Sequence, residues 1–312
     1  MRVLVTGGAG FVGSHLTDAL LDRGDQVTVV DDLSRGRATR LDSRVLLHPV
    51  SITDGRALAD VTEQARPEVI FHLAAQVDVR CSVTAPADDA GINIGGTINV
   101  LETARAAGAP VIFASTGGAM YGMNALVPSP EDLLPEPEAP YGTAKYCGEQ
   151  YIHLYNRLYG TQHAILRLGN VYGPRQDPAG EAGVISIFCG GLLRDGQVTV
   201  YGSGAQTRDY IYVGDVVEAF LAAARLGQPG MWNIGTGLET SVIDLISLIG
   251  QSAGRSPSPR FAPPRSGELQ RSALDVTRAA SDLGWKSSVQ LASGIGRVYR
   301  WVQAGEPDRA RR

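Results

Sequence analysis

A cluster of three glycines directly after the first apolar run constrains this chain more than any other feature. The run Val3–Val5 is followed by Gly7, Gly10 and Gly13, and a helical pattern of apolar residues begins at Phe11. In the spacing G-x-x-G-x-x-G the first glycine allows a tight turn, the second lets the backbone approach a pyrophosphate, and the third lets helix and strand pack closely. Free N–H groups and the positive end of the helix dipole would face that anion. The sequence therefore predicts a dinucleotide site between the first strand and the first helix, with a plain turn as the alternative.

Short apolar runs alternate with helical patterns through the first half of the chain. The expected buried strands are 3–5, 27–30, 69–71, 111–113 and 164–168. The expected helices among them are 11–21, 89–106 and 141–158. Alternation of this kind produces an α/β fold, in which helices cover both faces of a parallel sheet. We expect a Rossmann-type, doubly wound parallel sheet over residues 1–169, with a returning segment near 208–228.

The pattern changes after residue 170, where glycines and prolines multiply and apolar runs shorten. Residues 170–312 are therefore expected to form mainly a smaller, mixed C-terminal domain that binds substrate. Its expected elements are strands near 198–201 and 231–234 and helices near 240–249, 276–283 and 292–304. The stretch 251–267 is rich in Ser, Pro and Arg, which predicts an irregular surface connection. The last residues, 308–312, are expected to fray.

Charge and composition exclude several classes of protein. The net charge of −4 leaves no global basic footprint for a nucleic acid. No apolar run approaches the roughly 18 residues of a membrane span, and the chain opens on a strand rather than on a signal-peptide core. The three cysteines lie far apart and lack metal-ligand spacing. We therefore expect a cytoplasmic protein with no nucleic-acid or membrane partner and no bound metal.

Two adjacent carboxylates follow the second expected strand, at Asp31 and Asp32. A carboxylate at this point can accept hydrogen bonds from the hydroxyls of an adenosine ribose, and its charge would repel a 2′-phosphate. The pair therefore favours NAD over NADP as the cofactor. Arg35 and Arg37 lie nearby in the sequence and could instead support a phosphate, and Asp31 could simply cap a turn.

A tyrosine and a lysine, Tyr141 and Lys145, open the long expected helix at 141–158. Positions i and i+4 lie on one helical face. A lysine ammonium near a tyrosine hydroxyl favours the phenolate and lowers a pKa that starts near 10. A phenolate tuned in this way is a general base near neutral pH. The pair therefore predicts proton transfer, with a solvated helix face as the alternative.

These motifs together make the chain resemble the extended short-chain dehydrogenase/reductase family, and within it the UDP-galactose (UDP-glucose) 4-epimerases, over essentially its whole length. Five further segments resemble family motifs in the family's order, at 72–75, 93–97, 169–176, 208–215 and 265–268. The resemblance implies a catalytic Tyr141 and Lys145. It implies a cofactor site made of Gly7, Gly10, Phe11, Val12, Asp31, Asp32, Ser34, Ile52, Leu73, Ala74, Ala75, Asn93, Tyr141 and Lys145. It implies a UDP-sugar site made of Asn170, Val200, Tyr201, Arg208, Arg265 and Glu268, in which the two guanidinium groups would clamp the diphosphate.

One departure from the family pattern concerns the catalytic hydroxyl. The family usually carries Ser or Thr four residues before a Tyr-Gly pair, and here the residue four before Tyr121 is Gly117. Thr116 is the nearest substitute and Ser115 the next. We therefore expect one of these two side chains to hold the sugar hydroxyl, the alternative being that Thr116 only fixes the loop.

The same loop separates reaction types within the family. In the family that this chain resembles, nucleotide-sugar 4,6-dehydratases and UDP-glucuronate decarboxylases carry acidic residues in this loop. This chain has Gly118 and Ala119 at the corresponding positions. Without those carboxylates, the resemblance implies an NAD-dependent isomerase that inverts C4 of a UDP-hexose through a transient 4-keto intermediate. The alternatives are a UDP-sugar dehydratase or decarboxylase of the same fold and a non-catalytic dinucleotide-binding protein.

Two finer expectations also follow from the resemblance. The position seven residues after Arg265 is Ser272, whose small side chain suggests room for an N-acetyl group or an oxidised C6. The family often dimerises through two long helices per subunit, here about 87–106 and 141–158. We therefore expect a homodimer, although the apolar residues of the second helix could equally belong to the intramolecular core.

Overall fold

A parallel sheet with helices on both faces forms the larger part of the computed structural model, which describes residues 1–177, 183–194, 196–265 and 267–305. The strands of this sheet are β1 (Arg2–Thr6), β2 (Gln26–Val30), β3 (Leu46–His48), β4 (Val69–His72), β5 (Val111–Thr116), β6 (Ala164–Leu168) and β11 (Gly230–Ile234). Their order across the sheet is β11-β6-β5-β4-β1-β2-β3, and every pairing is parallel. The sheet reverses its winding direction beside β1, which confirms the Rossmann-type, doubly wound α/β fold.

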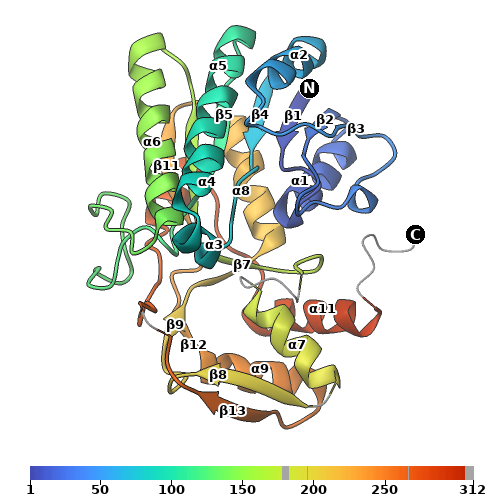
Figure 1. Ribbon diagram of the computed structural model, residues 1–312. Coiled ribbons are helices and arrows are strands. Elements are labelled where there is room, and N and C mark those ends of the chain that lie inside the picture. Colours follow the sequence, from blue (N-terminus) through green and yellow to red (C-terminus); the bar gives the residue numbers. More distant parts are fainter. Residues whose placement is uncertain (178–182, 195, 266, 306–312) are drawn as a thin grey trace.

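The two faces of the sheet carry separate apolar cores, because successive side chains of a strand point to opposite sides. In β1, Val3 and Val5 pack into one core and Leu4 into the other. The first core is closed by α1 (Phe11–Asp22) and α8 (Val213–Leu226). The second is closed by α2 (Gly55–Ala65), α5 (Thr97–Ala107) and α6 (Pro140–Tyr159). In Figure 1 this layered part lies above the smaller part of the molecule.

The helical stretch expected at 89–106 consists of three consecutive elements rather than one regular helix. It runs through α4 (Pro86–Ala90), the π-helical turn η2 (Gly91–Gly96) and α5. A further short helix, α3 (Val79–Thr84), precedes it, and η1 (Ala38–Arg40) is a short 3₁₀ turn. π-Helical turns occur frequently at functional sites, and this one carries Asn93, whose role is described below.

The smaller part is a mixture of short strand pairs and helices, as expected. The strand pairs are β7 (Asn170–Tyr172) with β10 (Tyr210–Tyr212), β8 (Gln197–Tyr201) with β13 (Ser258–Ala262), and β9 (Thr207–Arg208) with β12 (Thr240–Ser241). The helices are α7 (Val184–Arg194), α9 (Val242–Ala253) and α11 (Leu291–Gln303). The short helix α10 (Thr277–Leu283), expected in this part, packs instead against β11 and α8 and adds Ala279 to the first core. Helices α7, α9 and α11 pack on one another around a third apolar core (Figure 1).

Two details differ from the sequence-based expectation. The segment that returns to the large sheet reaches further than 208–228, because β11 pairs with β6 as far as Ile234. The stretch 251–267 is not wholly irregular, because Ser258–Ala262 forms β13 beside β8. That strand is mostly exposed and is held by backbone pairing, so its side chains carry no apolar alternation from which it could be predicted. The expected fraying at 308–312 lies outside the described residues.

A buried ion pair ties helix α6 to the large sheet. Arg167 on β6 donates two hydrogen bonds to Glu149 on α6, from Nε to Oε1 at 2.9 Å and from Nη2 to Oε2 at 2.6 Å. Both side chains are almost completely buried. The Ser115 hydroxyl on β5 donates to the same carboxylate at 2.5 Å. Three elements therefore meet at one carboxylate, and the helix that carries Tyr141 and Lys145 is fixed against β5 and β6.

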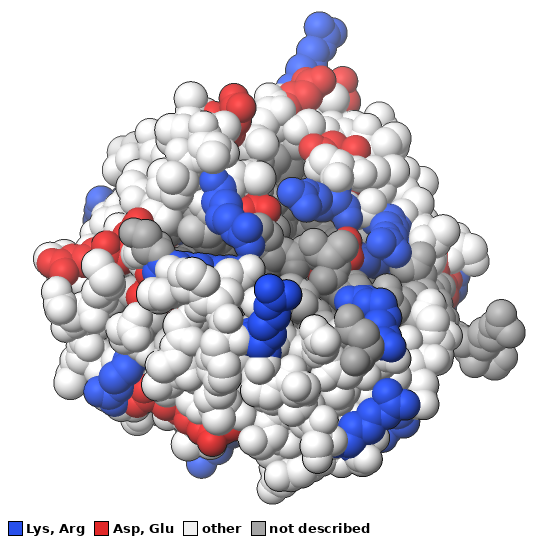
Figure 2. Space-filling view, turned by 60° about the horizontal axis from the view of Figure 1, so that its bottom comes forward, with Lys and Arg blue, Asp and Glu red and all other residues white. Residues whose placement is uncertain are grey.

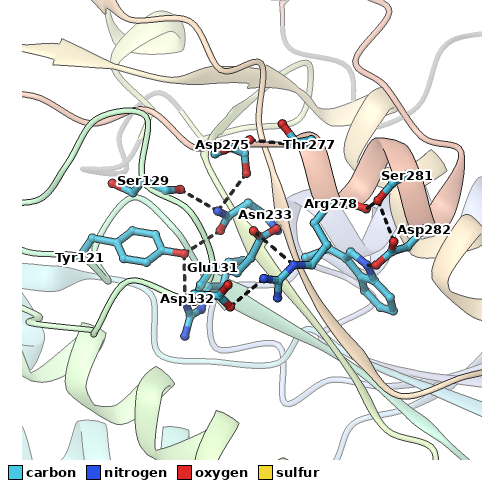
Figure 3. A network of polar contacts seen from close by, with 12 residues as sticks. Tyr121, Ser129, Glu131, Asp132, Asn233, Asp275, Thr277, Arg278, Ser281 and Asp282 are labelled. Carbon is cyan, nitrogen blue, oxygen red and sulfur yellow. Dashed lines mark hydrogen bonds and ion pairs between the residues drawn. The ribbon is translucent and has the colours of Figure 1, made fainter.

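The same arginine also contacts a polar network that includes Tyr121. Figure 3 shows this network with Tyr121, Glu131 and Asn233 labelled. Arg167 Nη1 donates to the Tyr121 hydroxyl at 2.9 Å, and that hydroxyl donates to Asn233 Oδ1 at 2.9 Å. The backbone N–H of Asn233 donates to Glu131 at 2.8 Å, and its side-chain amide donates to the carbonyls of Ser129 and Asp275. The network fastens the loop after β5 to β11 and to the segment before α10.

Candidate active site

The predicted cofactor and catalytic residues lie at the carboxyl end of the large sheet, where ligands bind in folds of this kind. This end faces the smaller part of the molecule. Figure 2 brings that part forward and shows a hollow surrounded by Lys and Arg side chains. Such a setting suits an anionic ligand.

The glycine turn requires glycine at two positions for steric reasons. Gly7 has a φ of +71°, and a Cβ on it would lie 2.6 Å from the backbone nitrogen of Ala74. A Cβ on Gly13 would lie 2.1 Å from the carbonyl oxygen of Gly7. Gly10 is the N-cap of α1 and provides no side-chain cap. The N–H groups of the first turn, which includes Phe11 and Val12, are thus left for an external acceptor such as a pyrophosphate.

Asp31 lies against this turn at the end of β2. Its Oδ2 accepts a hydrogen bond from the backbone N–H of Ala9 and its Oδ1 accepts one from that of Leu33, both at 2.9 Å. Burial raises the pKa of Asp31, and these two hydrogen bonds oppose the rise. Asp32 forms a local turn instead, in which it accepts from the N–H and the hydroxyl of Ser34. Asp31 is therefore held rigidly where the ribose of a dinucleotide is expected, and Asp32 is more exposed.

The two arginines that offered the NADP alternative face acidic side chains in this structure. Arg35 lies 3.9 Å from Asp78, and Arg37 lies 3.9 Å from Asp177. Arg35 is 69% exposed and Arg37 50% exposed at the side chain. Neither side chain is packed into a site preformed for a 2′-phosphate.

A chain of hydrogen bonds through His72 positions the segment after β4. The hydroxyl of Thr97 donates to the carbonyl of Asn93 at 2.7 Å, so its oxygen accepts from His72 Nε2 at 3.0 Å. That assignment leaves His72 Nδ1 to accept from the Thr6 hydroxyl at 2.8 Å, while the Thr6 oxygen accepts from the N–H of Ala74. Burial lowers the pKa of His72 to about 3, so the ring is neutral. The predicted cofactor residues Leu73, Ala74 and Ala75 follow directly on the chain.

Asn93 acts on the same segment through its side chain. Its Oδ1 accepts from the backbone N–H of Gln76 and its Nδ2 donates to the carbonyl of Gln76, both at 2.9 Å. Nδ2 also donates to Asp89 at 3.0 Å. Asn93 therefore clamps the segment 73–76 from behind. The direct contact of Asn93 with the cofactor that the resemblance implies stays a prediction. Ile52, another predicted cofactor residue, is buried in the second core.

Tyr141 and Lys145 lie in the first turns of α6, which begins at Pro140. Lys145 is buried, and its Nζ donates to the carbonyl of Ala114 on β5 at 2.9 Å. The Tyr141 hydroxyl makes no hydrogen bond with a described residue and is half-buried. Burial raises the pKa of Tyr141 to about 12 and lowers that of Lys145 to about 8. The structure thus brings the predicted pair together beside β5, where the neutral forms of both groups are favoured.

The two candidate hydroxyls at the end of β5 have different environments. Ser115 is committed to Glu149, as described above. The Thr116 hydroxyl makes no hydrogen bond with any residue that the structure describes. Because side chains alternate along a strand, these neighbours face opposite sides, and Thr116 is the one left for a ligand.

Gly117 has a packing reason to lack a side chain. A Cβ on Gly117 would lie 2.6 Å from Cδ1 and 2.7 Å from Cδ2 of Leu274. Leu274 is buried, packs with Met120 and Tyr121, and is fixed by its N–H, which donates to Asp209. The usual family hydroxyl is therefore excluded at position 117 by a leucine from the C-terminal part of the chain.

Four of the residues predicted to bind the UDP-sugar contact one another in two pairs, Arg265 with Tyr201 and Arg208 with Glu268. The Arg265 guanidinium lies 4.0 Å from the centroid of the Tyr201 ring. Arg208 lies 3.7 Å from Glu268 and donates to the backbone carbonyls of Thr207 and Leu269.

The remaining predicted substrate residues differ in how their side chains are placed. Asn170 has a buried side-chain oxygen that no described residue hydrogen-bonds. The side chain of Val200 is buried in the third core, so only its backbone is placed to border a ligand. Ser272 is also buried.

Three residues that position the site were not predicted. They are Gln76, Asp89 and Glu149. Glu149 follows Lys145 by four residues and Asp89 precedes Asn93 by four, so each shares a helical face with a predicted residue. That four-residue spacing is the sequence pattern from which Asp89 and Glu149 could have been predicted.

The contact between Gly117 and Leu274 can be measured in a double-mutant cycle. Gly117→Ala is expected to destabilise by about 1–3 kcal/mol through overpacking, and Leu274→Ala by about 2–5 kcal/mol through the cavity it leaves. The double variant should lose less than the sum, by roughly 0.5–3 kcal/mol. Urea unfolding measures all four proteins.

Gly118→Ala is the matched control for this cycle. A Cβ at Gly118 would meet Asn170 Oδ1 at 3.1 Å and is not near Leu274. Its effect should therefore add to that of Leu274→Ala. Additive losses for Gly117→Ala and Leu274→Ala would contradict the packing explanation.

Comparison with known proteins identifies the family. The family model for "NAD dependent epimerase/dehydratase family" matches residues 3–235. The UDP-glucose 4-epimerase of Mycolicibacterium smegmatis is 45% identical over 310 residues, which cover 97% of this chain and 99% of that protein. A crystal structure of the Thermotoga maritima UDP-glucose 4-epimerase with UDP-glucose has a TM-score of 0.96 and 44% identity, covering 98% of this chain and 99% of the other.

A second solved structure bears on the cofactor. The Thermus thermophilus UDP-glucose 4-epimerase in complex with NAD has a TM-score of 0.92 and 38% identity, covering 97% of this chain and 99% of the other. These matches span nearly the full length of both proteins in each comparison. The chain belongs to the NAD-dependent epimerase/dehydratase family.

Proposed function

We propose that this protein is an NAD-dependent UDP-glucose 4-epimerase, an isomerase that inverts C4 of a UDP-hexose through a transient 4-keto intermediate. The observation that carries the proposal is the Tyr141–Lys145 pair on α6, whose lysine is hydrogen-bonded to β5. Thr116, the last residue of that strand, has a hydroxyl without a hydrogen-bond partner among the described residues. The similarity to proteins described as UDP-glucose 4-epimerases supports the same activity. The proposed catalytic groups are a base, Tyr141, and a hydroxyl, that of Thr116, next to a cofactor site.

The cofactor site fits NAD because its parts match the chemistry of a dinucleotide. The uncapped first turn of α1 offers N–H groups to a pyrophosphate, and Asp31 is held where it can accept from ribose hydroxyls. Bound NAD supplies a hydride acceptor at the sugar C4 and a positive nicotinamide ring. Asn93 and His72 keep the segment 73–76 in place on the opposite side of the turn.

The chain's own residues perform the proton transfer in the proposed mechanism. Tyr141, as the phenolate, takes the proton from the 4-hydroxyl of the sugar and later returns it. Thr116 hydrogen-bonds that hydroxyl and passes the proton. Lys145 holds the nicotinamide ribose, and its charge favours the phenolate of Tyr141.

The nucleotide part of the substrate is held by the smaller part of the molecule. Arg208 and Arg265 hold the diphosphate, Asn170 donates to it, Glu268 contacts the nucleotide ribose, and Tyr201 borders the uracil. Anchoring the diphosphate keeps the 4-keto sugar in the site while it turns to present its other face.

The lyase alternative is disfavoured by the residues after Thr116. Elimination of water or loss of CO₂ needs a further acid or base near the sugar. Gly118 and Ala119 provide neither, and Gly118 faces the side chain of Asn170.

The proposal is tested by incubating the NAD-loaded enzyme with UDP-glucose, UDP-N-acetylglucosamine and UDP-glucuronate. Chromatography and NMR should show equilibration at C4 without any change in mass. The Tyr141→Phe variant should lose C4 inversion by at least about 100-fold, because the base is removed. A product lighter by water or CO₂, or full activity of Tyr141→Phe, would contradict the proposal.

Thr116 and Ser115 are distinguished by a pair of alanine variants. Thr116→Ala is expected to lower kcat about 100-fold or more with little change in stability, because it removes a hydroxyl that contacts the substrate. Ser115→Ala is expected to lower the free energy of unfolding by roughly 1 kcal/mol through the lost bond to Glu149, with kcat changed far less. The reverse pattern would assign the relay to Ser115.

We also propose a cytoplasmic homodimer. In α6, Ile152 and Tyr155 belong to the intramolecular core, whereas Leu154 is 39% and Leu158 61% exposed. Val83 on α3, which packs against α6, is also 61% exposed, so both helices expose apolar side chains that a second copy could cover. No helix in the described ranges has the length and apolar character to cross a membrane.

Sedimentation of the intact enzyme measures the oligomeric state. The wild type should sediment as a dimer, and Leu158→Arg should shift it toward monomer by placing a charge in the apolar surface. A monomeric wild type at micromolar concentration would contradict the dimer.

A further inference from the structure

Asp89 is a buried carboxylate that the catalytic scheme above does not use. It lies on α4 and is 1% exposed. Its Oδ1 accepts from the side-chain amides of Gln76 at 2.8 Å and Asn93 at 3.0 Å. Its Oδ2 is buried and has no hydrogen-bond partner among the residues that the structure describes. A buried carboxylate oxygen left unpaired is costly, so its retention needs a physical reason.

The helix that carries Asp89 packs directly against the helix that carries the catalytic pair. Helix α4 contacts α6, on which Lys145 is 3% exposed. The Lys145 ammonium donates to the carbonyl of Ala114 and lies 4.7 Å from the centroid of the Phe113 ring. It forms no ion pair within 4 Å with a described side chain. A buried ammonium in this state is unfavourable, and a nearby opposite charge would help it to keep its proton.

Two acidic groups in the described part of the chain act on Lys145, Asp89 and Glu149, and they differ in whether they are paired with a cation. Glu149, one turn further along α6, is already paired with Arg167 through two hydrogen bonds. His72 on β4 is neutral, because burial lowers its pKa to about 3. Asp89 forms no ion pair with a described residue, so its charge is not matched by another cation.

We propose that Asp89 is a positioning residue of the active site, whose carboxylate is the counter-charge that keeps the buried Lys145 ammonium charged and directed toward its partners. Gln76 and Asn93 fix this carboxylate through Oδ1 and leave Oδ2 for the electrostatic role. The proposal rests on the catalytic roles proposed above for Tyr141 and Lys145.

The directions of the pKa shifts agree with this geometry. Burial raises the pKa of Asp89, and the Lys145 charge opposes the rise. Burial lowers the pKa of Lys145 to about 8, and the Asp89 charge opposes the fall. Burial raises the pKa of Tyr141, and the Asp89 charge adds to the rise. Removing the negative charge should therefore lower the pKa of both Lys145 and Tyr141.

The test is the pH dependence of kcat for Asp89→Asn, which keeps the shape of the side chain and removes its charge. The proposed active form has Tyr141 deprotonated and Lys145 protonated, so both limbs of the profile depend on the pKa values of these two groups. Both limbs should move to lower pH by about one unit, a size typical of a nearby charge. Asp88→Asn is the matched control, because Asp88 is exposed on the same helix, and its profile should not move.

A lower kcat with an unmoved profile would overturn the proposal, because a merely structural role has no reason to shift both limbs together. If Asp89→Asn is too unstable to assay, urea unfolding of Lys145→Met and of Lys145→Met/Asp89→Asn decides the question. A counter-charge without its cation is unfavourable, so the double variant should be at least as stable as Lys145→Met. A less stable double variant would overturn the proposal.

This second measurement does not depend on the reaction. A Tyr141→Phe enzyme that keeps its activity would remove the proposed catalytic assignment and leave the Asp89–Lys145 coupling standing. Loss of that coupling with Tyr141 still essential would remove only the role of Asp89.

Discussion

The buried ion pair between Glu149 and Arg167 is the interaction on which the rest of the site depends. It joins α6 to β6, and through the Ser115 hydroxyl it also joins α6 to β5. Removing one partner of such a pair leaves a buried, unpaired charge, which typically costs about 3–5 kcal/mol. Because Glu149 follows Lys145 by one helical turn, the same contact sets the rotation of α6 that directs Tyr141 and Lys145 toward β5. Through hydrogen bonds to Tyr121 and then Asn233, the same arginine also holds the loop that follows β5. Figure 3 shows the part of this network around Asn233.

The hydrogen bond from Ser115 to Glu149 is also one reason why the proposed catalytic hydroxyl on β5 belongs to residue 116. Ser115 is used for structure, and position 117 is closed to a side chain by Leu274. Thr116 lies between them on the opposite face of the strand from Ser115, and its hydroxyl has no hydrogen-bond partner in the described part of the chain. The departure from the usual family pattern thus follows from two packing constraints, one on each side of Thr116. The chemistry proposed for the site survives because the strand still presents one hydroxyl.

The sequence predicts those features that depend on local spacing. The alternation Val3, Leu4, Val5 divides β1 between two cores, and the glycine spacing places the turn before α1, so the Rossmann-type fold could be predicted from short patterns. Features that depend on contacts between distant residues could not. Leu274 excludes a side chain at Gly117 across 157 positions of the chain, and β13 is held by backbone pairing that leaves no apolar pattern. The burial of Val200 in the third core is a further contact of this kind, and the prediction that this residue borders the uracil then concerns its backbone.

Burial and nearby charges together determine the protonation states of Tyr141 and Lys145. Burial favours neutral Tyr141 and neutral Lys145, which is the opposite of what a phenolate base and its supporting ammonium require. The site therefore needs charges that act against burial. A carboxylate such as Asp89 favours the charged lysine and at the same time disfavours the phenolate, so it cannot activate both groups. A positive charge beside Tyr141 is the complement, since it favours the phenolate directly. The proposed cofactor brings such a charge in its oxidised form only, which makes the base competent at the stage of the cycle when a proton must be removed.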